Sequence, residues 1–296
     1  MHVSNILWRE TPEGEFERGL HTWSSGEQKP YFLKLEKGQR IAWTIRGPKT
    51  CVGYLDRDMR LNPCPDSQSI SKSKIRCGPC SAMDYIDACI RCDGRVCQAQ
   101  PERWERCKNT EYAVYSAVFK TGAIKVGVSS LRRVRTRWIE QGADFAVIIQ
   151  KIRGGKAARQ IESKLGRLRG ITKSVRASTK AKHLLTPLAI DEAYSKIAEF
   201  SKLAGLPVPE DSSLADLSSF YNIPELDSLP KPILKRGSPI NGTQILGSVV
   251  GLKGPLLILS LDGTYTYINS KRLIGYHIDR DSEVRVINQT GLSEFI

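Results

Sequence analysis

The sequence predicts an α+β protein, in which a central αβ core is joined to a cysteine-rich zinc module and to strand-rich N- and C-terminal regions. Three observations lead to this class. Short runs of β-branched and aromatic residues occur near both ends of the chain. All eight cysteines fall between Cys51 and Cys107. The middle of the chain combines a hairpin pattern with the apolar spacing of helices.

The 296-residue chain is long enough for about two domains. With 40% hydrophobic and 26% charged residues, its composition is that of a soluble protein. The sequence contains no run of about 18 apolar residues. Its first residues lack the basic and then apolar layout of a signal peptide. We therefore expect a cytoplasmic protein that does not associate with membranes.

Five regions follow one another along the chain. They are a strand-rich N-terminal region at 1–60, a zinc-binding cysteine module at 61–110, a basic core at 111–204, a Pro-rich connector at 205–240 and a strand-rich C-terminal domain at 241–296. In the first region, the runs Tyr31–Leu33 and Ile41–Ile45 predict strands.

The cysteines form two C-x-x-C motifs with eight residues between them. Four thiolates from such motifs can bind one tetrahedral zinc ion, and a closed all-thiolate site is structural. We therefore predict a structural zinc on Cys77, Cys80, Cys89 and Cys92, and Cys97 could replace one of them. A possible second zinc site uses Cys51, Cys64, Cys97 and Cys107. Disulfides in an oxidising or hyperthermophilic cytosol, or redox-active C-x-x-C pairs, are the two alternatives.

The basic core begins with a predicted hairpin, in which Tyr112–Phe119 and Ile124–Val128 are the strands. A helix ending near Gly142 and a third strand at Phe145–Ile152 follow. The next helix has its apolar stripe at Ala158, Ile161, Leu165 and Leu168. Because side chains alternate along strands, an odd hairpin loop places Tyr115 and Lys125 on one face, and an even loop separates them.

The net charge of +14 is concentrated in this core. Between Lys120 and Lys182 lie eight Lys and nine Arg against three acidic residues, and charges in the rest of the chain balance. Most basic runs are solvated helical faces. So much charge of one sign instead favours binding to nucleic-acid phosphates, with DNA favoured and RNA possible.

A second amphipathic helix is predicted through Ile190–Leu203, and the Pro-rich connector follows it. The C-terminal region then predicts four strands, which could form a small barrel or an added sheet layer packed with the N-terminal strands. These strands are Ser248–Val250, Leu256–Leu261, Tyr265–Ile268 and Glu283–Ile287.

The order of parts in the core resembles a GIY-YIG nuclease. Ala113-Val114-Tyr115 matches the last two positions of the first tripeptide, and Lys125-Val126-Gly127 matches the last two of the second. Arg135 stands at the usual interval after Gly127, although Arg133 or Arg137 could fill its role. Glu162 lies on the later helix, where this family has its metal ligand.

The resemblance implies a metal-dependent endonuclease with Tyr115, Lys125, Arg135 and Glu162 as catalytic residues. Glu162 would hold Mg²⁺ or Mn²⁺, Arg135 would bind the scissile phosphate and Tyr115 would orient or deprotonate water. Lys125 replaces the tyrosine of the second tripeptide and could act as a base only with a lowered pKa. The expected nucleic-acid contacts are Arg132, Arg133, Arg137, Lys151, Arg153, Lys156 and Arg159.

Most of the chain also resembles a family of bacterial and archaeal proteins carried under a domain-of-unknown-function label. The shared motifs are Cys51-Val52-Gly53-Tyr54, Asn62-Pro63-Cys64-Pro65, the paired C-x-x-C, Lys125-Val126-Gly127-Val128 and the seven residues from Arg137 to Ala143. This likeness implies no activity. Two alternatives to the nuclease therefore stay open, a non-catalytic zinc-stabilised DNA- or RNA-binding protein and a zinc-stabilised adaptor for an acidic protein.

Overall fold

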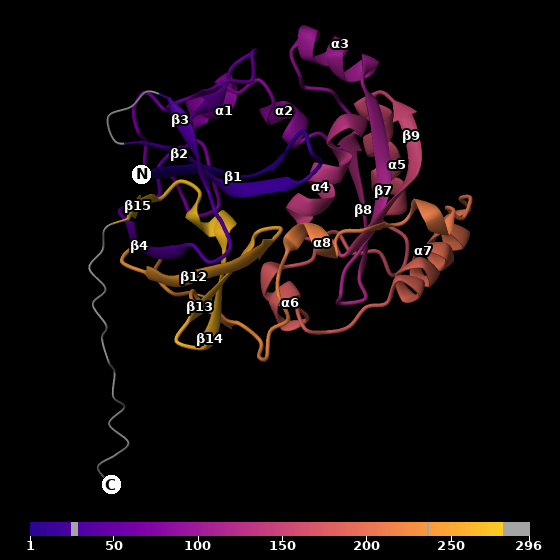
Figure 1. Cartoon of the computed structure of the whole chain (residues 1–296). Helices are drawn as coiled ribbons and strands as arrows, with labels where there is room; N and C mark the ends of the chain where they lie inside the picture. Colours follow the sequence, from indigo (N-terminus) through magenta and orange to yellow (C-terminus); the bar gives the residue numbers. More distant parts are fainter. Residues whose placement is uncertain (25–28, 236, 281–296) are drawn as a thin grey trace.

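Two main β-sheets organise the fold, which the computed structural model describes for residues 1–24, 29–235 and 237–280 (Figure 1). The mixed, strand-rich architecture confirms the α+β class predicted from the sequence. The strands of the larger sheet are β1 His2–Glu10, β2 Phe16–Trp23, β3 Pro30–Lys34, β4 Arg40–Arg46, β11 Lys231–Pro232, β12 Gln244–Lys253, β13 Leu256–Leu261, β14 Thr264–Asn269 and β15 His277–Asp279. Their spatial order is β11-β14-β13-β12-β4-β15-β1-β2-β3.

This order joins the two ends of the chain in one sheet. Strand β12 pairs with β4, and β15 lies between β4 and β1. The strands expected in both terminal regions are therefore present, and they pair with one another. The strand expected at residues 283–287 lies outside the described residues.

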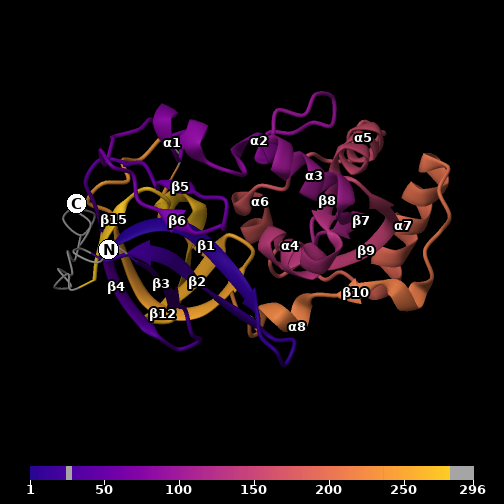
Figure 2. The same cartoon turned by 90° about the horizontal axis from the view of Figure 1, so that it is seen from above.

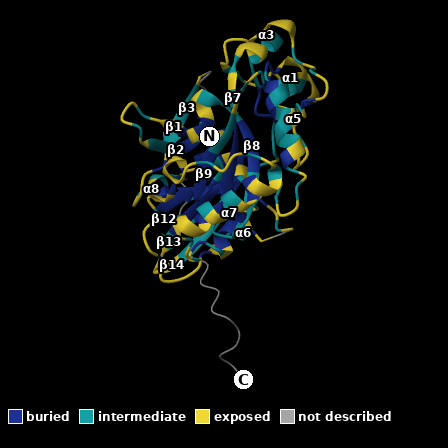
Figure 3. Ribbon diagram, turned by 90° about the vertical axis from the view of Figure 1, so that its right-hand side faces the viewer, coloured by how far each residue is buried: buried dark blue, intermediate teal, exposed yellow. Residues whose placement is uncertain are grey.

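The smaller sheet contains the predicted hairpin and third strand. Its strands are β7 Glu111–Val118, β8 Ile124–Ser130, β9 Phe145–Arg153 and β10 Ala215–Asp216, in the order β10-β9-β7-β8. Around it lie η1 Leu131–Arg133, α4 Val134–Gln141, α5 Gly155–Leu165, α6 Ala177–Lys182 and α7 Ile190–Ala204. Figure 3 shows buried strands of this sheet beside α5 and α7, whose outward surfaces are exposed.

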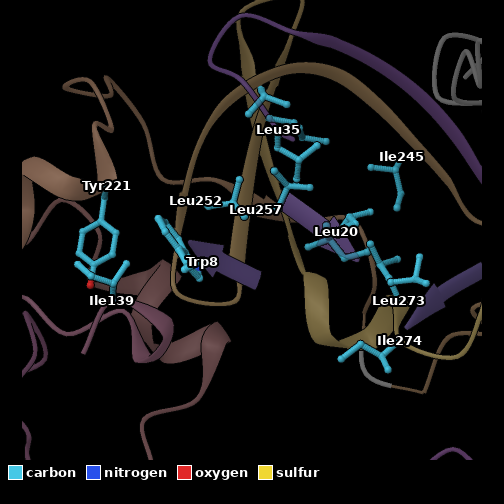
Figure 4. Packing of buried hydrophobic residues seen from close by; sticks show 14 of the residues in the cluster. Trp8, Leu20, Leu35, Ile139, Tyr221, Ile245, Leu252, Leu257, Leu273 and Ile274 are labelled. Carbon is cyan, nitrogen blue, oxygen red and sulfur yellow. The ribbon is translucent and has the colours of Figure 1, made fainter. Parts of the chain in front are cut away.

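The two faces of β7 pack against different partners, as the alternation of a strand requires. Val114 packs on the side of α5, while Ala113, Tyr115 and Ala117 belong to the main core. This core continues into the larger sheet through residues such as Trp8, Leu20, Ile139, Leu252 and Leu257 (Figure 4). The small and large sheets therefore share one apolar interior.

Two glycines allow the close approach of the sheets. Gly142 ends α4 with φ +66°, and Gly254 follows β12 with φ +55°. A Cβ atom added to Gly254 would lie 2.6 Å from the backbone nitrogen of Gly142, so neither position has room for a side chain. Beside them, the buried Lys253 pairs with the buried Asp144. The core and the C-terminal strands are thus fixed to each other.

The Pro-rich segment at 205–240 is packed through short elements. It contains η2 Asp211–Ser213, β10, α8 Ser218–Tyr221 and β11, and β10 adds a strand to the smaller sheet. The Tyr221 hydroxyl donates a hydrogen bond to the Ala143 carbonyl at 2.6 Å. These contacts tie the segment to both sheets. In the part of the chain that the structure describes, no helix has the length and apolar character needed to cross a membrane.

The cysteine-rich segment lies above both sheets in Figure 1, and Figure 2 shows it from above. Its elements are β5 Tyr54–Leu55, β6 Leu61–Asn62, α1 Gly78–Met83, α2 Asp87–Ile90 and α3 Pro101–Asn109. They are short and joined by loops. Side chains of the loops therefore have to hold this segment together.

Candidate functional site

Four buried cysteines form a candidate metal centre. The sulfur atoms of Cys51, Cys64, Cys77 and Cys80 all lie within 4.8 Å of one another. Cys77 is the N-cap of α1 and Cys80 lies in its first turn, where residues three apart share a face. Cys51 and Cys64 come from the loops before β5 and after β6. The sequence thus brings two loops and one helix start to a single point.

The geometry of this cluster fits a structural zinc ion. Zinc–sulfur bonds of about 2.3 Å place the sulfurs of a tetrahedron about 3.8 Å apart, and the sulfurs of Cys64 and Cys77 are 3.9 Å apart. Backbone N–H groups of Cys77 and Gly53 donate to the Cys51 sulfur at 3.2 and 3.4 Å, as groups around a thiolate do. Burial raises the pKa of the Cys80 thiol, so thiolates here need a cation.

A buried ion pair supports the metal centre from one side. Arg76 and Asp84 lie 2.8 Å apart, and their side chains are 10% and 0% exposed. Asp84 also accepts the backbone N–H of Leu55 at 2.9 Å. Gly53 has φ +87°, and an added Cβ would overlap the Asn62 carbonyl. These contacts position the loops around the four sulfurs.

The grouping of cysteines differs from the one expected from the sequence. Cys77 and Cys80 lie with Cys51 and Cys64, whereas Cys89 and Cys92 lie outside the cluster. After α1 the chain turns at Asp84, which bonds back to β5, and α2 then leads away. The second expected set, Cys51, Cys64, Cys97 and Cys107, is not gathered either, because Cys107 contacts Tyr112. Gly53 stands two residues after Cys51 as Gly94 does after Cys92, so this glycine spacing does not decide the grouping.

The hairpin β7–β8 brings Tyr115 and Lys125 to one face of the smaller sheet. Val118 pairs with Ile124, so the loop has five residues, and Ala117 pairs with Lys125. Tyr115 pairs with Gly127, and its ring lies over that glycine, where a side chain would clash. The odd loop therefore gives the arrangement that a shared site requires.

Gln141, the last residue of α4, connects three of the polar groups. Its side-chain amide donates to the Tyr115 hydroxyl, and its Oε1 accepts from Lys125 Nζ at 2.9 Å. Its backbone carbonyl accepts from Lys180 Nζ of α6. Sequence reasoning did not assign Gln141 or Lys180 to the site. The only signals were the position of Gln141 next to Gly142 and the place of Lys180 in a basic run.

Arg137 is the arginine that reaches this cluster. It lies against the Tyr115 hydroxyl and pairs with Glu140 at 3.2 Å. Arg135 points away, because residues two apart lie on opposite sides of a helix. It pairs with Glu10 at 2.6 Å and stacks near Phe220. Arg135 was the first choice from the sequence and Arg137 an alternative, and the structure places Arg137 beside Tyr115 and Arg135 beside Glu10.

Glu162 approaches the cluster from another direction. Its helix, α5, packs on the face of the sheet that carries Val114, and Glu162 acts electrostatically on Tyr115 and Lys125 past the edge strand β8. Arg159 Nη1 donates to the Glu162 carboxylate at 2.7 Å. One quarter of the Glu162 side chain remains exposed.

Burial and mutual repulsion change the pKa values of this cluster. Burial, with Arg137 adding to it, lowers the pKa of Lys125 to about 8, and burial with Lys271 lowers that of Lys180 to about 7. Lys271 comes from η3 Ser270–Leu273 after β14, and burial also lowers its pKa. Burial raises the pKa of Tyr115 to about 12, although Arg137 partly opposes this rise. Cations from the core and from the C-terminal strands therefore converge.

The expected nucleic-acid contacts are distributed around the same core. Arg132 and Arg133 lie on η1, Lys151 and Arg153 on β9, and Lys156 and Arg159 on α5. Four of these six residues are exposed, while Lys156 and Arg159 are half-buried. Arg133 pairs with Glu140 at 3.0 Å, and Arg153 donates to the Asn109 side chain at 3.2 Å.

Comparison with family models gives one match. A family described as "Protein of unknown function (DUF2797)" matches residues 38–278, which is most of the chain. The chain belongs to this family. The DUF2797 span begins just before β4 and ends in β15, so it contains the metal centre, the hairpin and Lys271. No curated protein and no solved structure matches the chain.

Proposed function

We propose that this DUF2797 protein is a metal-dependent endonuclease that hydrolyses phosphodiester bonds in nucleic acid, with DNA the favoured substrate. The observation that carries the proposal is the convergence of Tyr115, Lys125 and Arg137 around Gln141, with Glu162 acting on the same groups. These residues come from the elements that the GIY-YIG resemblance assigns to catalysis. That relationship is itself part of the proposal.

Lys125 is the better general base of the two candidates. A base works best when its pKa lies near the working pH. Lys125 has a pKa of about 8, while that of Tyr115 is about 12. Near neutral pH a useful fraction of Lys125 is therefore neutral and can accept a proton from water. Tyr115, held by Gln141, orients the attacking water.

Arg137 has the position and the chemistry to bind the scissile phosphate. Its side chain is 45% exposed, so its guanidinium can reach a ligand. Two parallel N–H groups match two phosphate oxygens, which fixes the orientation of the phosphate. Lys271 and Lys180 add positive charge where the transition state gains negative charge.

Glu162 fits a divalent cation that retains most of its water ligands. Mg²⁺ in phosphate-handling sites is often held by one or two carboxylates and the substrate itself. Such an ion would supply Lewis-acid stabilisation of the phosphate and its leaving oxygen. Arg159 now pairs with the carboxylate and has to release it.

A second function, non-catalytic binding of DNA or RNA, is favoured by two features. Tyr115 is fully buried, and its hydroxyl already has a partner in Gln141. Glu162 is neutralised by Arg159. A core with these contacts would retain the basic surface without the chemistry.

Cleavage assays distinguish the two functions. Labelled duplex, single-stranded and branched DNA and RNA would be incubated with Mg²⁺ or Mn²⁺ and the natural protein, Glu162→Ala, Lys125→Met or the control Arg135→Ala. Metal-dependent cutting that disappears in the first two variants, but not in the control, supports the nuclease. Tight, salt-sensitive binding without cutting supports the binding protein. Neither binding nor cutting would refute both.

A further inference from the structure

The segment from Cys89 to Thr110 has almost no hydrophobic core of its own. The structure describes every residue of it, and Gly94 alone is buried. Its larger aliphatic residues face solvent, with Ile90 58% and Val96 72% exposed. Helix α3 likewise has no buried residue. A segment this short and polar buries too little apolar surface to hold one conformation, so it needs a cross-link such as a metal ion or a disulfide.

The side chains that this segment turns inward include its four cysteines. Cys89, Cys92, Cys97 and Cys107 are all half-buried, and none of them is in a disulfide. The cysteines are thus half-buried, whereas Ile90 and Val96 are exposed. Their spacing, with two, four and nine residues between successive cysteines, contains one C-x-x-C turn followed by two separate thiols.

Two polar groups donate hydrogen bonds to these sulfurs. Arg103 Nε donates to the Cys89 sulfur at 3.4 Å, and the Tyr112 hydroxyl donates to the Cys107 sulfur at 3.4 Å. Arg103 and Cys107 are four residues apart on α3 and therefore share a face. A cation and a hydroxyl aimed at sulfur stabilise thiolates, as outer groups around zinc sites do.

Two parts of the segment, the loop at Gly94 and the end of α3 at Cys107, rest on the first half of α5. Gln160 donates to the Gly94 carbonyl at 3.0 Å, and a Cβ at Gly94 would lie 2.9 Å from the Gln160 nitrogen. At the other end, the Cys107 sulfur lies against Gly155, where a Cβ would be 2.6 Å away from it. Cys107 and the loop that joins Cys92 to Cys97 therefore both lie against the helix that carries Glu162.

We propose that Cys89, Cys92, Cys97 and Cys107 form a second structural zinc site. Within the described residues only the Cys51 cluster has its sulfurs packed to within 4.8 Å, so the loop around Gly94 closes on the ion when it binds. Each thiol releases its proton to solvent as its sulfur binds the metal. The site holds α3 and the loop against α5 and so supports Arg159 and Glu162. This proposal does not depend on the nuclease activity.

Metal content tests the proposal directly. The full-length protein, grown with zinc, should contain two zinc ions per chain by mass spectrometry of the metal. The double variant Cys89→Ser, Cys107→Ser should contain one, and the control Val96→Ser, at an exposed position of the same loop, should contain two. One ion in the natural protein, or two in the double variant, would overturn the proposal.

Alkylation of the natural protein tests it without any cysteine variant. In the zinc-loaded protein, all four half-buried thiols should react slowly, and a chelator should accelerate their reaction by about tenfold or more. Equal rates before and after chelation would refute the site. So would thiols that react only after a reductant is added, because that result indicates disulfides. As a second variant, Arg103→Leu should weaken zinc binding at this site by about 10–100-fold, while Arg106→Leu should not.

Discussion

The metal centre and the basic cluster each gather groups of like charge at one place, negative in the first case and positive in the second. Around Cys51, four potential thiolates meet in a buried space. Around Gln141, three lysines and one arginine approach one another from α4, α6, β8 and η3. The first region could hold a cation, and a bound anion would balance the charge of the second.

The two regions differ in what holds them when the counter-charge is removed. The cysteines come from loops and a six-residue helix, so little besides the Arg76–Asp84 pair keeps them together. The basic cluster rests on β7, whose Ala113, Val114 and Tyr115 are fully buried. We therefore predict that the region around the cysteines folds only when a metal is bound. Removing an anion from the basic cluster should change the charge balance there and leave the fold of the smaller sheet intact.

The largest expected effect is therefore at Cys80, which has no exposed surface. Cys80→Ser should remove this zinc and unfold the segment around it, because structural zinc binding supplies about 10–16 kcal/mol in small zinc domains at pH 7. Limited proteolysis should cut this segment in the variant, and the thermal transition should fall or broaden. The control Met83→Ala, an exposed position in the same helix, should behave as the natural protein. A resistant, zinc-free Cys80→Ser protein would show that the loops fold without metal.

The next effect concerns the two arginines of α4. Arg137→Ala should weaken oligonucleotide binding by about 10–100-fold, because a charged hydrogen bond contributes about 1.5–3 kcal/mol. Arg135→Ala is the matched control, since Arg135 faces Glu10 and not the cluster. Fluorescence anisotropy at several salt concentrations measures both, and only Arg137→Ala should reduce the salt slope. Equal losses in the two variants would place the binding surface elsewhere.

These two arginines also show what the sequence could and could not establish. Alternation and helical spacing predicted β7, β8, β9 and α5, and Gly142 marked the end of α4. The choice of arginine depended on the phase of α4, which η1 delays until Val134. No local sequence pattern predicts that α4 begins only after this 3-10 turn. The first choice from the sequence, Arg135, therefore lies two positions before Arg137 and on the opposite side of the helix from Tyr115.

Contacts between segments far apart in the chain were the second feature that the sequence could not predict. Cys77 could pair equally well in sequence with Cys89 or with Cys51, and the folding of β5 and β6 decided between them. Lys271 joins the cluster only because β14 and η3 pack beside the core. Such residues have no periodic signal near the motif, so only the tertiary structure shows their role.

A smaller effect should appear in the pH dependence of anion binding. Lys180 and Lys125 lose their protons near pH 7 and pH 8, so affinity for an oligonucleotide should fall about three- to tenfold between about pH 6 and pH 9. Binding near pH 8 should take up protons, which calorimetry in buffers of different ionisation enthalpy detects. Replacing both lysines with arginine should flatten the profile. An unchanged slope in that variant would assign the titration to other groups.

The groups facing these lysines come from every element around them. Lys125 faces Arg137, Lys271 and Arg159 as cations and Glu162 as an anion. Lys180 faces Lys271, Lys125 and Lys253 as cations and Asp144 as an anion. Without ligand, the unfolded chain binds more protons than the folded one between about pH 8 and pH 10.5, because the pKa of Lys125 falls from 10.5 to about 8 on folding. The stability of the free protein should therefore rise through this window.

The smallest expected effect is that of Lys271→Met, which should change the stability of the free protein and its affinity for an oligonucleotide in opposite directions. Lys271 is an exposed residue, but its ammonium lies near Arg137, and partial desolvation together with that charge lowers its pKa, so keeping it protonated costs the free protein some stability. Lys271→Met should raise the melting temperature of the free protein slightly, because it removes a charge that Arg137 repels and that solvent only partly screens. The same change should weaken oligonucleotide binding several-fold, and the exposed control Lys173→Met should leave stability unchanged. Stability lost together with binding would show that Lys271 has a structural partner. Stability gained while binding falls would show that the free protein retains an unfavourable charge for the ligand it binds.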